Sequence, residues 1–168
     1  MTFMQKLAAP ARAPEIPAEH DIYGWLAGSW ELDVIRYGVD VRDRAIRGEA
    51  HFGWVLEGRA VQDVWIMKTE PLVNTYGTTL RIYDPTLGAW RVTWVNPISG
   101  RRDELIGRRI GDDLVQIGTH QDGTPIRWRF VDTTADSFRW LGEALAADGQ
   151  TWTLEAEFHG RRCANTRT

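Results

Sequence analysis

The sequence is poor in residues that several common classes of protein require. It contains one cysteine, Cys163, which excludes an internal disulfide and a zinc site built from several cysteines. Cys163 follows two arginines near the C-terminus and not a catalytic turn, so we interpret it as a bystander thiol. Residues 1–21 hold a single lysine and no long apolar run, so we expect no secretory signal, no membrane span and a cytoplasmic location.

An excess of one charge is also lacking. The 20 basic and 23 acidic residues are interspersed, and their net charge of -3 offers no basic face to a nucleic-acid backbone. The chain has no HExxH sequence, no nucleophile elbow, no glycine-rich phosphate loop and no three-histidine set. Metal-dependent hydrolysis, serine hydrolysis and nucleotide-dependent chemistry therefore lack their usual residues, and we expect neither a metal nor another cofactor.

What is present is the pattern of a β-protein. From Ser29 onward, runs rich in Trp, Val, Ile, Thr and Phe are separated at intervals of about ten residues by Gly, Asp or Pro. Such short breaks favour antiparallel neighbours, because parallel strands need crossovers of about a dozen residues. The predicted strands are 29–37, 44–56, 59–69, 75–84, 89–96, 101–108, 113–120, 125–132, 137–143 and 150–159.

The predicted fold class is all-β: a single antiparallel up-and-down β-barrel of about ten strands, since closure removes the exposed edges that an open sheet would leave. A length of 168 residues suits one domain, which we place at 21–160. A short helical turn at 21–27, capped by Asp21, begins it. Residues 1–20, rich in proline and alanine, are expected to form a flexible arm that buries little, and residues 161–168 a C-terminal tail.

Alternation of side chains predicts which residues face the interior of the barrel. Three strands have a clear pattern, but two do not. In strand 59–69, one phase turns Asp63 and Trp65 inward, and the other phase turns Gln62 inward. The phase of strand 113–120 is equally ambiguous. The inward residues of the clear strands are Trp90, Val92, Trp94 and Asn96; Ile126, Trp128 and Phe130; and Trp152, Leu154, Ala156 and Phe158.

Several short motifs resemble a known family when taken in order. Residues 26–30 contain Gly-x-Trp, residues 56–59 are Leu-Glu-Gly-Arg, and residues 83–85 are Tyr-Asp-Pro. Over about residues 22–159 the chain resembles a bacterial family of lipocalin-like β-barrel proteins in the calycin group. The resemblance implies a barrel that binds hydrophobic small molecules, and in the nitrobindin branch haem is bound through a late histidine. His159 is the late histidine here, but alternation turns it away from the interior. We therefore keep a haem-binding barrel only as a further alternative.

Nine tryptophans suggest where a ligand would bind. An indole offers a large apolar surface and one N–H donor, and it can either fill a barrel or line a pocket. Trp30 is expected to plug one end, but a ten-stranded barrel is wider than the eight-stranded kind that side chains fill, so interior space should remain. The candidate ligand-binding residues are Trp65, Tyr76, Trp94, Asn96, Gln116, Trp128, Phe130 and Trp140.

Two residues are candidates for proton chemistry. Asp63, if inward, would need a partner or would take up a proton. His120 precedes the turn at 122–123, and it stands either at a barrel mouth, suited to proton transfer, or exposed beside the turn. The arginines at 101–102 and 108–109 are interpreted as part of a solvated strand face, with an anion site as the alternative.

The leading hypothesis is therefore a protein that binds a small hydrophobic or aromatic molecule inside the barrel. The alternative is a cofactor-independent cyclase or isomerase that uses the same pocket, with Asp63 or His120 as its acid or base. A structural or interaction module is a third possibility. The expected partner is a small hydrophobic molecule, with no nucleic acid and no membrane, and the chain is expected to be a monomer or a homodimer.

Overall fold

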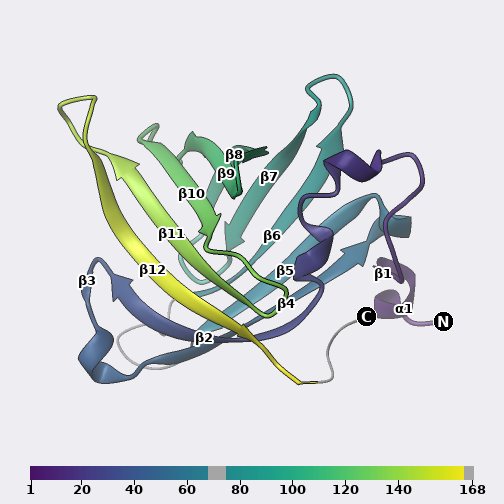
Figure 1. Ribbon diagram of the computed structural model, residues 1–168, viewed down its shortest axis with the longest axis horizontal. Helices are drawn as coiled ribbons and strands as arrows, with labels where there is room; N and C mark the ends of the chain where they lie inside the picture. The colour runs from purple at the N-terminus through teal and green to yellow at the C-terminus, as the bar shows by residue number, and fades with distance from the viewer. Residues whose placement is uncertain (68–74, 165–168) are drawn as a thin grey trace.

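The computed structural model describes residues 1–67 and 75–164, and within them the chain is all-β. The long strands are β2 (Gly28–Tyr37), β4 (Arg47–Val55), β5 (Ala60–Met67), β6 (Thr75–Asp84), β7 (Ala89–Asn96), β8 (Arg101–Ile110), β9 (Asp113–Thr119), β10 (Pro125–Val131), β11 (Ser137–Leu145) and β12 (Trp152–Arg162). Each pairs antiparallel with the next, and β2 closes the barrel by pairing with both β4 and β12 (Figure 1).

Shorter elements flank these strands. The two-residue strand β1 (Ala8–Ala9) pairs with the end of β4, and β3 (Val39–Asp40) folds back on β2. The helical elements are the short helix α1 (Phe3–Leu7) and the 3-10 turns η1 (Ala18–His20), η2 (Gly24–Leu26), η3 (Arg42–Arg44) and η4 (Leu56–Gly58).

This architecture confirms the predicted fold class. Each of the ten predicted runs corresponds to one barrel strand, and the expected helical turn is η2, where Asp21 Oδ1 accepts a hydrogen bond from Gly24 N. Two predicted boundaries differ from those of the structure or lie outside the described residues. β12 continues to Arg162, so the first two residues of the predicted tail belong to the last barrel strand. Residues 68–69 of the third predicted strand and 165–168 of the tail lie outside the described residues.

One end of the barrel is closed by apolar packing. The Trp30 side chain is fully buried, and its indole N–H donates to Leu26 O over 2.8 Å. The Trp25 ring meets Trp30 edge to face, with ring centroids 5.9 Å apart. Tyr23, fully buried beside Leu26, extends this packing toward the middle of the barrel. A ligand would therefore have to enter from the opposite end.

Residues 1–12 are mostly exposed, whereas Ala13 and Ile16 of the same N-terminal segment are buried against the barrel. β1 extends the sheet at Val55 and Trp54, beside β4 in Figure 1. Ala13 N donates to Gly58 O over 2.9 Å, and the Ile16 side chain is only 4% exposed. The prolines do break helical structure here, as expected, but the extended chain between them still places apolar side chains against the barrel.

Inward-facing glycines make room for large rings inside the barrel. A Cβ atom added at Gly77 would lie 2.6 Å from Cη2 of Trp94, and one at Gly142 would lie 2.8 Å from Cη2 of Trp140. Since both distances are shorter than carbon atoms tolerate, each glycine allows the adjacent indole to lie flat against the barrel wall. This pairing of small and large residues shapes the interior of the open half.

Candidate functional site: a tryptophan-walled cavity

A cavity of about 620 Å³ occupies the open half of the barrel. It is surrounded by side chains from most of the barrel strands and is reached from the end opposite Trp30. Its walls are mainly aromatic, whereas its polar groups form two clusters, one at the deep end and one at the mouth. The lining residues are Tyr37, Gly38, Trp65, Met67, Thr75, Thr79, Arg81, Trp94, Asn96, Ser99, Arg101, Gln116, His120, Trp128, Trp140, Gly142, Glu155, Ala156 and Phe158.

Four tryptophans form most of the aromatic wall. The Trp140 ring lies 5.6 Å from Trp128 and 5.8 Å from Trp65, measured between ring centroids. Phe158 adds a further ring 5.3 Å from Trp140. Trp94 comes from β7, over Gly77. These tilted contacts are favourable for aromatic pairs and hold the rings in a fixed arrangement, so the wall is preformed for a flat or apolar molecule.

A buried polar cluster lies at the deep end of the cavity. Arg81 Nη1 donates to Asp63 Oδ2 over 2.7 Å, and Thr79 N donates to Asp63 Oδ1 over the same distance. Gln116 Oε1 accepts from Tyr23 OH at 3.0 Å and from Arg81 Nε at 3.3 Å. Burial raises the pKa of Tyr23 well above its ordinary value, so this hydroxyl keeps its proton and donates it. Asp63 and Arg81 thus neutralise each other inside the barrel.

Two buried polar atoms within the described residues make no hydrogen bond: Gln116 Nε2 and Thr75 Oγ1. Both residues line the cavity. An unsatisfied buried donor costs about 1–3 kcal/mol in a folded protein, so such atoms are uncommon and are often found at functional sites. The amide nitrogen of Gln116 is therefore a buried donor without a protein partner, on a residue that lines the cavity.

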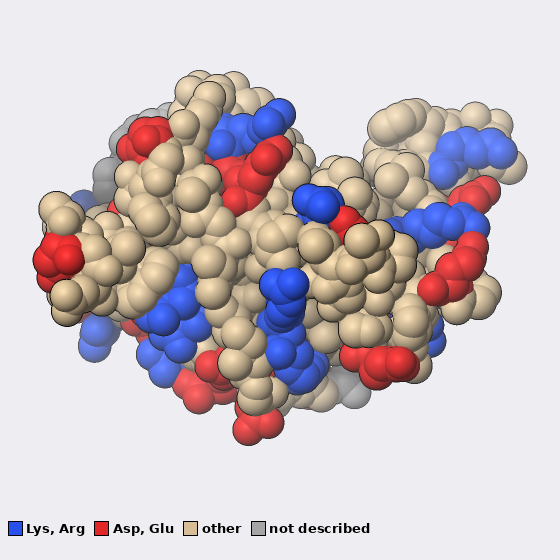
Figure 2. All heavy atoms as spheres, turned by 90° about the horizontal axis from the view of Figure 1, so that it is seen from above, with Lys and Arg blue, Asp and Glu red and all other residues tan. Residues whose placement is uncertain are grey.

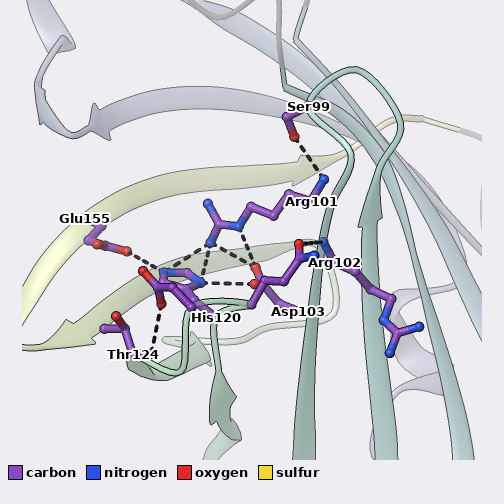
Figure 3. Close-up of polar contacts among 9 residues, drawn as sticks. Ser99, Arg101, Arg102, Asp103, His120, Thr124 and Glu155 are labelled. Atoms are coloured by element: carbon purple, nitrogen blue, oxygen red, sulfur yellow. Dashed lines mark hydrogen bonds and ion pairs between the residues drawn. The ribbon is translucent and has the colours of Figure 1, made fainter.

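A second polar group, the mouth cluster, consists of Arg101, Asp103, His120 and Glu155 (Figure 3). His120 Nδ1 lies 3.1 Å from Asp103 Oδ1, and His120 Nε2 lies 3.4 Å from Glu155 Oε2. Arg101 Nε donates to Asp103 Oδ2 over 2.9 Å. The Asp103 side chain is fully buried, whereas 14% of the His120 side chain is exposed. The cluster holds an imidazole between two carboxylates at the edge of the cavity.

The mouth cluster shifts the acidity of its members. Hydrogen bonding to Asp103 raises the pKa of His120, against the opposing effects of burial and of Arg101. Burial alone would raise the pKa of Asp103, but hydrogen bonds from His120 and Arg101 outweigh it, and the pKa lies below its ordinary value. The pair therefore favours an imidazolium beside a carboxylate, and an imidazole in such a contact can give or take a proton.

A β-bulge on β12 turns Glu155 toward the cavity. Gly142 pairs with Ala156 but Glu143 pairs with Leu154, which leaves Glu155 as an extra residue on β12. The alternation reverses at this point, so the prediction that Trp152 and Leu154 face inward is wrong. Trp152 instead lies on the outer wall, where the guanidinium carbon of Arg127 is 4.6 Å from a ring centroid.

Most of the predicted site residues line the cavity. His120 is among them and lies at the mouth of the cavity, which was one of the two positions considered for it. Asn96 has a structural role as well, because its Oδ1 accepts from Ile98 N and Ser99 N and thereby holds the turn between β7 and β8. The predicted residues that line the cavity are Trp65, Trp94, Asn96, Gln116, His120, Trp128 and Trp140.

Three predicted site residues lie elsewhere. Tyr76 points outward and is 39% exposed, because β6 turns Thr75, Thr79 and Arg81 inward. Phe130 faces inward but is fully buried below the cavity, against Phe138. Asp63 is inward, which resolves the phase of β5, but it contacts Arg81 and is not part of the lining.

Several site residues were not predicted. Arg81 escaped attention because an arginine on an apolar face conflicts with alternation, although Asp63 already required a buried partner. Arg101 was interpreted as part of a solvated face, but Asp103 lies two residues from Leu105 and so shares the face of that buried side chain. That period of two was the available signal for Asp103. Glu155 could not be found by alternation, since a bulge breaks it.

No protein-family model matches this chain, and no curated protein is significantly similar to it. The resemblance to lipocalin-like proteins therefore stays a prediction. The haem alternative depends on His159, but His159 Nε2 contacts Glu157 Oε1 at 2.8 Å, outside the cavity lining. The histidine that the resemblance would assign to haem thus does not fit that role.

Three further findings concern the surface, metal binding and membrane spans of the described residues. Basic and acidic side chains are interspersed over the face drawn in Figure 2. In the described part of the chain, no group of three or more His, Cys, Asp and Glu side chains is placed to hold a metal ion. None of the helices there is long and apolar enough to cross a membrane.

Proposed function

We propose that this protein binds a small hydrophobic or aromatic molecule inside its barrel. The observation that carries the proposal is the cavity of about 620 Å³ between Trp65, Trp94, Trp128 and Trp140. Its volume falls in the range of about 300–1,000 Å³ that is typical of small-molecule sites. Large apolar walls with a few placed polar groups are also typical of such sites, because the walls supply affinity and the polar groups fix orientation.

The proposal also covers the class of partner, the cellular location and the oligomeric state. The partner is a small molecule and not a nucleic acid or a membrane, and the protein acts in the cytoplasm as a monomer or a homodimer. The interspersed charges support this choice, since a nucleic-acid site needs a continuous basic surface.

Mass spectrometry of the compound that co-purifies with the native protein identifies the ligand, and tryptophan fluorescence then measures its affinity. Trp94→Ala and Trp128→Ala should each weaken binding by about tenfold or more, because each removes apolar contact area. Trp152→Ala is the matched control, since Trp152 lies on the outer wall. If both cavity variants fold and bind with unchanged affinity, the ligand is not held in this cavity.

A second candidate, a cofactor-independent cyclase or isomerase, is favoured by the contact between His120 and Asp103 at the cavity. A raised imidazole pKa next to a bound molecule is suited to giving or taking a proton. His120→Gln keeps the approximate shape but removes this chemistry. In an enzyme it should lower turnover of the bound compound or its precursor while leaving affinity nearly unchanged; in a carrier, wild type and variant should both leave the compound unaltered.

A further inference from the structure

The deep polar cluster presents one donor without a protein partner, and its direction is fixed. Gln116 is 1% exposed, and its Oε1 accepts from both Tyr23 OH and Arg81 Nε. The guanidinium can only donate, so an exchange of the amide oxygen and nitrogen would bring two donors together. The Nε2 group must therefore point away from Arg81, and it makes no hydrogen bond with any of the described residues.

The surroundings of this donor are apolar on one side and electrically balanced on the other. Trp128 is directly opposite Gln116 in the pairing of β10 with β9, and both line the cavity. The positive charge of Arg81 is offset by Asp63, with 2.7 Å between Nη1 and Oδ2. The donor is thus an uncharged N–H beside an aromatic wall, with no excess positive charge for an anion.

The geometry points to a ligand class: an aromatic molecule that carries a neutral carbonyl oxygen, which accepts a hydrogen bond from Gln116 Nε2 while its ring lies against Trp128. This inference rests on the proposed function, because it requires a molecule in the cavity. A ketone, aldehyde or amide satisfies the buried donor. A carboxylate is disfavoured, because it would lose its water without gaining an unpaired cation.

The mouth cluster does not bind the ligand carbonyl oxygen that accepts from Gln116. Gln116 lies on β9 and His120 directly follows the end of that strand, four residues further on, which corresponds to about 13 Å of extended chain. A single carbonyl group therefore does not bridge the two, and the deep donor selects one end of the ligand independently of proton chemistry at the mouth.

Three naphthalenes of nearly equal shape test the inference: 2-acetylnaphthalene, 2-isopropenylnaphthalene and 2-naphthoate. The isopropenyl compound replaces C=O by C=CH₂ and so removes only the acceptor. Dissociation constants are measured by tryptophan fluorescence for wild type, Gln116→Met and Gln116→Glu. The glutamate variant keeps an oxygen for Tyr23 and Arg81 but has no amide donor. Gln62→Met is the matched control, because Gln62 bonds Thr78 on the outer face of β5.

The ratio of the alkene to the ketone dissociation constant should fall by about tenfold from wild type to Gln116→Met, as expected for loss of one buried hydrogen bond. It should fall similarly in Gln116→Glu and stay unchanged in Gln62→Met. Wild type should also bind the ketone more tightly than the naphthoate. An unchanged alkene-to-ketone ratio in both Gln116 variants, or tighter binding of the naphthoate, overturns this inference alone. Failure of all three probes to bind wild type overturns the proposed function with it.

Discussion

Asp63 on β5 and Arg81 on β6 form an ion pair inside the barrel, with 2.7 Å between Oδ2 and Nη1 and side chains that are 0% and 2% exposed. Removing one partner of a buried pair leaves the other charge without compensation and costs about 3–5 kcal/mol. Arg81→Met should therefore lower the free energy of unfolding by about this amount in chemical denaturation.

The double variant Asp63→Asn/Arg81→Met should lose less than the sum of the two single losses, because no isolated charge remains. Glu104→Gln is the control, since Glu104 pairs with Arg102 on an exposed surface, and it should change stability by less than about 1 kcal/mol. Additive losses in the double variant would mean that the two residues do not stabilise each other.

His120 should make stability depend on pH. Its folded-state pKa is raised by Asp103 above the value of about 6.5 expected for an unfolded chain. The folded state then binds the proton more tightly, so this contribution is complete below about pH 6.5 and is lost as the pH rises through the folded pKa. The unfolding free energy of wild type minus that of His120→Gln should decrease with rising pH in this window. A difference that is constant with pH would exclude the effect.

The N-terminal segment should matter through Ile16 and not through its first helix. Ile16→Ala removes a buried side chain and should cost about 2–5 kcal/mol, whereas Phe3→Ala, at a position that is 75% exposed, should stay within about 0.5 kcal/mol. Thermal denaturation measures both. Deleting residues 1–7 should likewise have little effect. If Ile16→Ala is as stable as wild type, the segment does not pack on the barrel in solution.

The sequence could predict the number and order of the strands because each turn has its own chemistry. It could also predict that Trp94, Trp128 and Trp140 face inward, because they lie on strands where apolar and polar residues alternate up to their positions. Asn96 follows from the same period of two, whereas the phase of strand 113–120 stayed ambiguous and the mouth position of His120 was one of two alternatives. These predictions depend only on local pattern, and local pattern is sufficient where one face of a strand is buried.

The remaining site residues depend on contacts between strands that are distant in sequence. Arg81 is inward because Asp63 and Gln116 accept its hydrogen bonds, and this places Tyr76 outside. Glu155 enters the mouth cluster through a bulge, which also turns Trp152 outward. Neither buried ion pairs nor bulges leave a periodic signal in one sequence, so alternation assigned these positions to the wrong face.

The last prediction concerns how strongly each neighbour in the mouth cluster changes the pKa of His120. NMR titration of the His120 ring protons can measure these changes. Asp103 contributes the largest increase in the pKa of His120 and Glu155 a smaller one, whereas Arg101 lowers it. Asp103→Asn should therefore lower this pKa more than Glu155→Gln does, and Arg101→Met should raise it. An equal response of His120 to the Asp103 and Glu155 variants would show that its ring does not lie nearer Asp103.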